Sequence, residues 1–132
     1  DVAKAMAMGA DAVSIGSAAM MALNCNADLY VEDYKKLGTE PGYCHHCHTG
    51  KCPVGVATQD PELEKRLNPI EAGKRLKNYL TTLTLELQTL ARANGKSDVR
   101  NLEPEDLAAL TVEAAAMARV PLAGTDWIPG KK

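Results

Sequence analysis

Cysteines and histidines crowd one short stretch of this sequence. The segment CHHCHTGKC, residues 44–52, holds Cys44, Cys47 and Cys52, and the fourth cysteine of the chain, Cys25, lies upstream. Thiolates and imidazoles bind soft metals, whereas a lone cysteine is usually an inert buried group. In a chain with no secretory signal, this density of thiols predicts metal ligation or redox chemistry rather than a disulfide framework.

A structural zinc site is the first interpretation of this segment. Thiolates together with one of three nearby imidazoles, those of His45, His46 and His48, would complete a tetrahedral shell. A zinc ribbon needs a second close pair of ligands, however, and Cys25 has no cysteine near it in the sequence.

Two further patterns occur in the same residues. Residues 44–48 satisfy C-x-x-C-H, the signature of covalent haem attachment, but such haem proteins are exported and the pattern leaves Cys52 unused. Cys44 and Cys47 also form a C-x-x-C dithiol, which in thioredoxin-like proteins begins a helix after a strand. The sequence predicts neither element at this point.

An iron–sulfur cluster is the fourth interpretation. Cys47 and Cys52 are separated by four residues, Pro53 follows them, and Gly50 and Gly55 allow the backbone to wrap a cluster. This spacing favours a cluster loop over the other three interpretations.

The elements around the cysteines predict a terminal piece of an α/β fold. Residues 2–8 have the apolar spacing of a short helix, and residues 11–15 form an apolar run typical of a buried parallel strand. Gly16 and Ser17 then turn the chain into a helix over 18–23. A parallel strand needs neighbours, so we expect the rest of the sheet to lie upstream of a fragment that is itself mainly helical.

The remainder of the chain predicts an irregular loop followed by helices. Residues 24–59 are rich in turn residues, and a helix is expected over 69–94, capped by Asn68 and stopped by Gly95. Its leucines form one apolar stripe that must pack on another surface: Leu76, Leu80, Leu83, Leu87 and Leu90. A further helical region is predicted over 104–119, and an extended strap over 121–132.

The composition of the chain is typical of a globular protein. The chain has 132 residues, 45% hydrophobic and 24% charged, with a net charge of -2, which is typical of one globular unit. No sequence-wide basic field exists to attract nucleic acid or anionic lipid. No apolar run of 18 residues and no signal peptide is present, so we expect a cytoplasmic protein with no membrane partner.

Four stretches together carry a resemblance to a known family. CHTGKCPVGVATQDP (47–61) resembles the cysteine segment in the flavin-containing synthase domain of glutamate synthases, and GADAVSIGSAAMMAL (9–23) resembles the strand and helix before it. NPIEAGKRLKNYLTTLTLELQTLAR (68–92) and NLEPEDLAALTVEAAAMARVPLAGTDWIPG (101–130) are similar to later parts of the same domain. The resemblance covers essentially the whole chain, and the CPVGVATQ string is its specific part.

The resemblance implies an oxidoreductase acting on CH–NH2 donors. The fold would be an FMN-binding (β/α)8 barrel, with its last strand and helix at 1–24, an iron–sulfur loop at 25–60 and C-terminal helices at 61–132. Such enzymes make L-glutamate from 2-oxoglutarate and glutamine-derived ammonia, with electrons passing from a donor through the cluster to FMN. The partners implied are the upstream barrel, a glutaminase subunit, and ferredoxin or an NAD(P)H-oxidising donor.

Site residues follow from the same resemblance. Cys25, Cys47 and Cys52 correspond to the family's three cluster ligands, and Gly16 with Ser17 would bind the FMN phosphate at a helix N-terminus. The three histidines are expected to tune the cluster rather than ligate it. The charges over 62–77 are expected to form a solvated face, with a docking surface for an acidic ferredoxin as the alternative.

The sequence departs from this family pattern between its first two ligands. An insert at 26–43 lengthens the short spacer of the long family members, and Cys44 adds a thiol that can convert a three-ligand 3Fe–4S centre into a four-ligand 4Fe–4S one. These features resemble stand-alone flavin subunits of glutamate-synthase-like and N-methylglutamate-synthase-like enzymes. The competing class is an electron-transfer or zinc-binding module without catalysis of its own.

Overall fold

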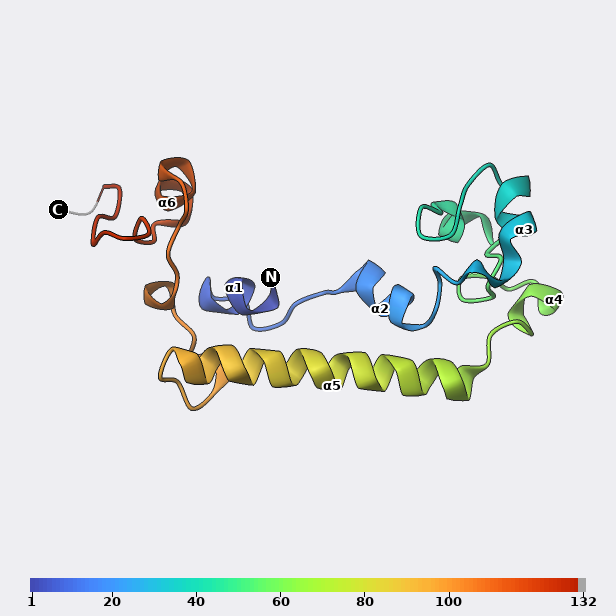
Figure 1. The fold of residues 1–132 in the computed structure, drawn as a ribbon, viewed down its shortest axis with the longest axis horizontal. Helices are drawn as coiled ribbons and strands as arrows, with labels where there is room; N and C mark the ends of the chain where they lie inside the picture. The colour runs from blue at the N-terminus through green and yellow to red at the C-terminus, as the bar shows by residue number, and fades with distance from the viewer. Residues whose placement is uncertain (131–132) are drawn as a thin grey trace. The chain divides into compact units, whose positions relative to one another are not determined.

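The computed structural model describes residues 1–130, and these form helices joined by loops (Figure 1). The chain divides into two compact units, Ile15–Thr82 and a second unit that joins Asp1–Ser14 to the chain from Leu83 onward. Within residues 1–130 there is no strand, and an isolated parallel bridge links Ala109 to Leu122. The predicted division of the chain into residues 1–24, 25–60 and 61–132 stays a prediction.

The strand predicted over residues 11–15 is wrong for this chain. These residues are irregular, and helix α2 (Gly16–Ala22) begins directly at Gly16 rather than at residue 18. A parallel strand is stabilised only by hydrogen bonds to adjacent strands, and residues 1–130 contain none. The mainly helical character expected of the fragment is therefore confirmed, and the barrel is not formed by this chain.

Small side chains build the core of the unit that holds both ends of the chain. Helix α1 (Val2–Ala7), the end of helix α5 (Pro69–Ala93) and the 3-10 turn η3 (Val99–Asn101) meet there. Ala7, Ala91 and Leu102 are buried together in this core. Alanine lets two backbones approach closely, so this packing needs few large residues.

Helix α5 follows the prediction for residues 69–94 closely. The Asn68 side chain accepts hydrogen bonds from the backbone N–H groups of Ile70 (3.1 Å) and Glu71 (3.2 Å), and Gly95 with φ of 72° ends the helix. Of the predicted leucine stripe, Leu76, Leu83 and Leu87 are half-buried, whereas Leu80 and Leu90 are exposed.

The helical region predicted over 104–119 is broken in two. A 3-10 turn η4 (Pro104–Asp106) precedes helix α6 (Val112–Ala118), because Leu107 is extended and Thr111 starts a new helix by accepting a hydrogen bond from the Ala114 N–H (3.1 Å). Ala115 is fully buried in α6. The strap predicted over 121–132 contains turns and the bridge residue Leu122 in its described part, and its last two residues lie outside the described range.

Short helices interrupt the loop predicted over residues 24–59. They are η1 (Asp28–Tyr30), α3 (Val31–Lys36) and η2 (His46–Thr49), followed by α4 (Pro61–Glu64). Tyr34 of α3, Cys52 and Val54 form the buried core of this unit. No helix within residues 1–130 combines the length and the apolar character needed to cross a bilayer.

Asp98 caps η3 and supplies a pH-dependent contribution to stability. Its carboxylate accepts hydrogen bonds from the Arg100 backbone and guanidinium, which lower its pKa from 3.8 to about 2. A depressed folded-state pKa stabilises the fold above the unfolded value, and this stabilisation is lost as pH falls toward the folded one. We expect Asp98→Asn in the full-length protein to lower the urea midpoint at pH 6, with the gap narrowing at pH 3. A gap that does not change with pH would contradict this explanation.

Candidate functional site

The four cysteines gather in the unit formed by residues 15–82. Cys52 is buried, Cys25 and Cys44 are half-buried and pack on the Tyr34, Cys52 and Val54 core, and Cys47 is exposed. All four thiols are free. Three of them, those of Cys25, Cys44 and Cys47, line one cavity of about 250 Å³. The folded chain thus brings together residues that are up to 27 positions apart in sequence, from Cys25 to Cys52.

The thiols influence one another electrostatically. Burial raises the pKa of the Cys25 thiol, and the neighbouring charges of Cys47, Cys52 and Cys44 raise it further. Burial, together with the neighbouring charges of Cys44, Cys52 and Cys25, raises the pKa of Tyr34 to about 12. Several thiolates at one place repel each other unless a cation compensates their charge, which is the electrostatic role of a bound metal centre.

The spacing of these groups bears on the kind of centre they can hold. Within residues 1–130, no three Cys, His, Asp or Glu side chains converge closely enough to hold a single metal ion. One tetrahedral zinc, with Zn–S bonds of about 2.3 Å, would bring its sulfurs to within about 3.8 Å of one another. Thiols around a cavity are the donors that a group of several atoms, such as an iron–sulfur cluster, requires.

The backbone that follows Cys52 has a restricted conformation. Pro53 is fully buried, and Gly55 has φ of 79°, a left-handed conformation that favours glycine. A Cβ atom at Gly55 would overlap the carbonyl oxygen of Leu63 and lie 3.1 Å from the Leu67 nitrogen. Glycine is therefore required here both by the positive φ and by the close approach of Leu63 in α4 and Leu67 just after it.

Two hydrogen-bonded links join α3 to the segments that carry cysteines. The Tyr34 hydroxyl donates to the Cys25 carbonyl oxygen over 2.8 Å. The Arg66 guanidinium donates to Asp33 and to the Pro53 carbonyl oxygen, both at 2.8 Å, and lies over the Tyr30 ring. Sequence reasoning missed these residues because their partners lie 9 to 33 positions away and no local pattern marks them.

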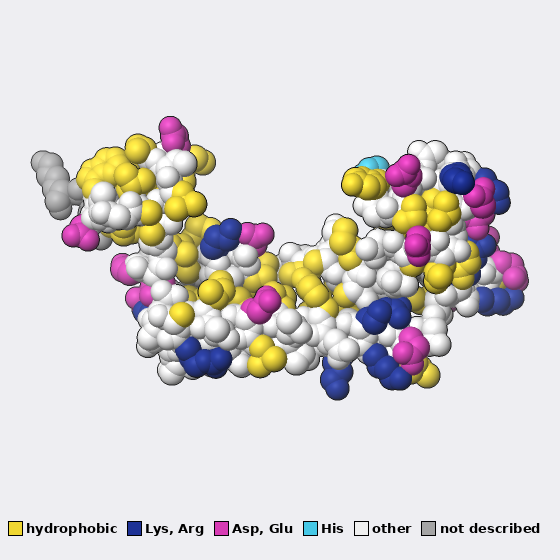
Figure 2. Space-filling view, viewed as in Figure 1, with side chains coloured by type: hydrophobic (Ala, Val, Ile, Leu, Met, Phe, Trp, Pro, Cys, Tyr) yellow, Lys and Arg dark blue, Asp and Glu magenta, His cyan; other side chains and the backbone are white. Residues whose placement is uncertain are grey.

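The charges over 62–77 were expected to form a solvated face, and Arg66 is an exception. Its side chain is 27% exposed and paired with Asp33. Lys65 and Lys74 do lie on the surface, each paired with an acid three residues earlier, and Lys35 and Lys36 of α3 are paired in the same way. Blue and magenta side chains consequently lie close together around this unit (Figure 2).

The residues predicted to bind FMN phosphate adjoin the cysteines. Ser17 lines the same cavity as Cys25, Cys44 and Cys47. Gly16 has φ of 24°, and nothing described in this chain lies within 4 Å of the position a Cβ would take. Within the described part of the chain, the space beside the Gly16 Cα atom is therefore open. Of the histidines, His45 also lines the cavity.

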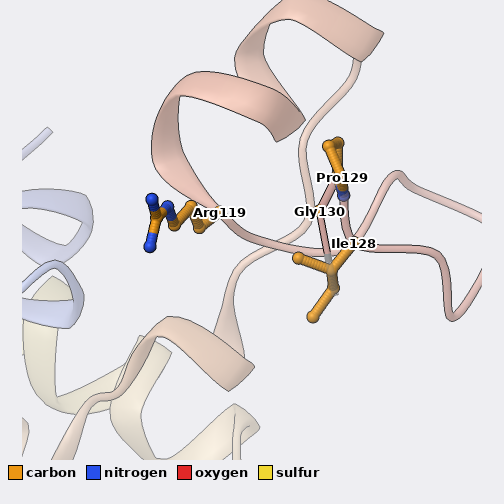
Figure 3. A pocket seen from close by; sticks show the side chains of 4 residues that line it. All are labelled: Arg119, Ile128, Pro129 and Gly130. Atoms are coloured by element: carbon orange, nitrogen blue, oxygen red, sulfur yellow. The ribbon is translucent and has the colours of Figure 1, made fainter. Parts of the chain in front are cut away.

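Another cavity lies in the C-terminal part of the chain (Figure 3). It has a volume of about 350 Å³ and is lined by Arg119, Ile128, Pro129 and Gly130. The Arg119 side chain points away from Ile128 and Pro129 (Figure 3). Among its described lining residues, only Arg119 has a polar side chain, whereas a catalytic or cofactor site brings several polar groups together.

Comparison with known proteins identifies the family. Residues 1–97 match the family described as "Conserved region in glutamate synthase". The chain belongs to this family, which confirms the resemblance carried by its cysteine segment.

Proteins similar to this chain are named as glutamate synthases or as glutamate-synthase-like proteins. The chain is 63% identical over 131 residues to the "Glutamate synthase large subunit-like protein" of Rhizobium meliloti, covering 99% of this chain and 30% of that protein. It is 41% identical over 102 residues to the "Archaeal glutamate synthase (NADPH)" of Methanocaldococcus jannaschii, covering 77% of this chain and 17% of that protein. The chain thus spans less than a third of the length of these relatives. No solved structure matches it.

Proposed function

We propose that this chain is part of an oxidoreductase that makes L-glutamate from 2-oxoglutarate and glutamine-derived ammonia. Membership of the glutamate synthase family supports this reaction class. The observation that carries the proposal is the cavity that Ser17 shares with Cys25, Cys44 and Cys47. The shared cavity supports the proposal, because electron transfer between a flavin and a cluster requires their two binding sites to lie close together.

In this proposal the cysteines hold an iron–sulfur cluster. Cys25, Cys44 and Cys47 would bind it from the cavity wall, and Cys52 from the buried side of the same loop. A bound cluster supplies one-electron transfer, and the chain's own contribution is to hold the thiols in place and limit access of water. Gly16 and Ser17 would bind the phosphate of FMN through backbone N–H groups at the start of α2.

The proposal extends to partners and cellular location. We expect the upstream barrel strands to supply the remaining flavin and substrate contacts, and a glutaminase to supply ammonia. Ferredoxin or an NAD(P)H-oxidising donor would supply electrons. The four cysteines are unpaired, which suits the reducing environment of the cytoplasm.

The composition of the full-length protein tests this function against a zinc-binding or purely electron-transferring module. We expect iron, acid-labile sulfide and FMN to copurify with it, together with glutamate formation from 2-oxoglutarate and glutamine when a reductant is supplied. Bound zinc without flavin would contradict the proposal. A cluster without flavin or glutamate formation would favour the electron-transfer module.

Replacing Gly16 by Val tests the phosphate site. The β-branched side chain would block approach to the backbone N–H groups, and losing a charge-assisted hydrogen bond there should weaken FMN binding about tenfold or more. Iron content should remain near that of the wild type. Gly38→Val is the control, because Gly38 also has a positive φ, of 69°, and open space around it. Equal loss of FMN in both variants, or equal loss of FMN and iron in Gly16→Val, would contradict the assignment.

A further inference from the structure

Helix α3 lies inside the insert that separates Cys25 from Cys47. Figure 1 shows it beside the loop that follows it in the chain. A simple spacer would leave the two cysteine-bearing segments free to move independently. Instead, α3 places Asp33 and Tyr34 next to each other. Tyr34 is hydrogen-bonded directly to the segment of Cys25, and Asp33 is connected through Arg66 to the segment of Cys52.

The first link acts on Cys25. Tyr34 is 1% exposed, and its ring packs in the core that contains Cys52 and Val54. Its hydroxyl donates to the Cys25 carbonyl oxygen over 2.8 Å. A buried tyrosine held by its ring has little freedom, so this bond fixes the Cys25 backbone relative to α3.

The second link connects α3 to the segment that carries Cys52. A single guanidinium nitrogen, Nη1 of Arg66, donates both to Asp33 Oδ2 and to the Pro53 carbonyl oxygen, each over 2.8 Å. The guanidinium carbon lies 4.4 Å from the centre of the Tyr30 ring, which restricts its orientation. Arg66 thereby joins α3 to Pro53, the residue that directly follows Cys52.

We propose that α3 clamps the cysteine site, with Tyr34 and Arg66 as positioning residues for Cys25 and Cys52 respectively. Ligands held by surrounding hydrogen bonds bind a metal centre without first paying the entropy of ordering the loop. The nature of that centre rests on the proposed function, whereas the clamp itself depends only on the contacts of this chain. The insert then serves to preorganise the site rather than to lengthen a loop.

Thiol reactivity of the full-length protein, after iron removal by a chelator, tests the clamp directly. Iodoacetamide labelling followed by mass spectrometry gives a rate for each cysteine. Tyr34→Phe should raise the rate at Cys25 about tenfold and change that at Cys52 little, and Arg66→Gln should do the reverse. Arg66→Lys should restore part of the protection, because an ammonium can still donate to both acceptors but cannot replace guanidinium stacking. Lys65→Gln breaks only an exposed ion pair and should leave all rates unchanged.

The rate of iron loss to a chelator tests whether the clamp acts on the metal-bound protein. In protein purified with its iron, both Tyr34→Phe and Arg66→Gln should lose iron to a chelator several-fold faster than the wild type. Variants that raise all four thiol rates equally, or none, would overturn the clamp. Thiol rates that change as expected with unchanged iron loss would overturn its role toward the metal centre. Absence of iron from the wild type would contradict the proposed function while the thiol rates still decide whether the clamp exists.

Discussion

Cys47→Ser in the full-length protein should abolish its iron–sulfur spectrum and reduce iron and sulfide to background. The Cys47 side chain is exposed on η2, so the change removes a thiolate without disturbing a packed core. Only four residues separate it from Cys52, and the loop between them contains Gly50 with φ of 72°. Both sulfurs can therefore reach one cluster.

The neighbouring residue His48 provides a matched control for this experiment. His48 is exposed on the same 3-10 turn, and the sequence predicts that it tunes the centre rather than binding it. His48→Ala should retain the iron and shift only the reduction potential. A full iron–sulfur spectrum in Cys47→Ser, or its loss in His48→Ala, would contradict the assignment of ligands.

Gly55→Ala should destabilise the protein by about 3 kcal/mol or more. Its left-handed backbone, with φ of 79°, disfavours any side chain, and the new Cβ would overlap the Leu63 carbonyl oxygen. The obstructing atoms are backbone and cannot rotate aside. The segment that carries Cys52 would therefore have to shift, and the change should also reduce bound iron.

Gly42→Ala separates the two causes of this effect. Gly42 has a similar φ of 84°, but nothing lies within 4 Å of a Cβ built there. Only the conformational cost remains, about 1–2 kcal/mol. Urea unfolding of the full-length variants measures the difference. Equal destabilisation by the two substitutions would show that the contact with Leu63 does not matter.

The sequence predicted those helices whose ends are determined by residues next to them in the chain. Asn68, Pro69 and Gly95 placed α5 to within a residue, because capping groups act on the helix that they adjoin. The helix α3 had similar signals, acids at its start and Lys35 and Lys36 at its end, but the turn residues around it favoured a loop. Six residues are too few for a clear apolar period.

Features that depend on residues far apart in the sequence could not be predicted from local patterns. The strand expected over 11–15 needs hydrogen-bonding neighbours, so an apolar run alone could not form it. Arg66 has the type and position of a solvated charge, yet it bonds Asp33 and Pro53, which lie 33 and 13 positions away. Cys25 lines one cavity with Cys44 and Cys47, although 18 residues of insert separate it from Cys44 and no local pattern connects them.

The central claim is that the four cysteines hold one iron–sulfur cluster, and electron paramagnetic resonance of the full-length protein tests it most directly. Four thiolates, with Cys44 as the additional ligand, predict a 4Fe–4S cluster that is silent when oxidised and gives a signal after reduction with dithionite. Cys44→Ala should alter that signal. A signal in the oxidised protein that survives Cys44→Ala would contradict the four-ligand centre, and no iron–sulfur signal in either state would contradict the cluster itself.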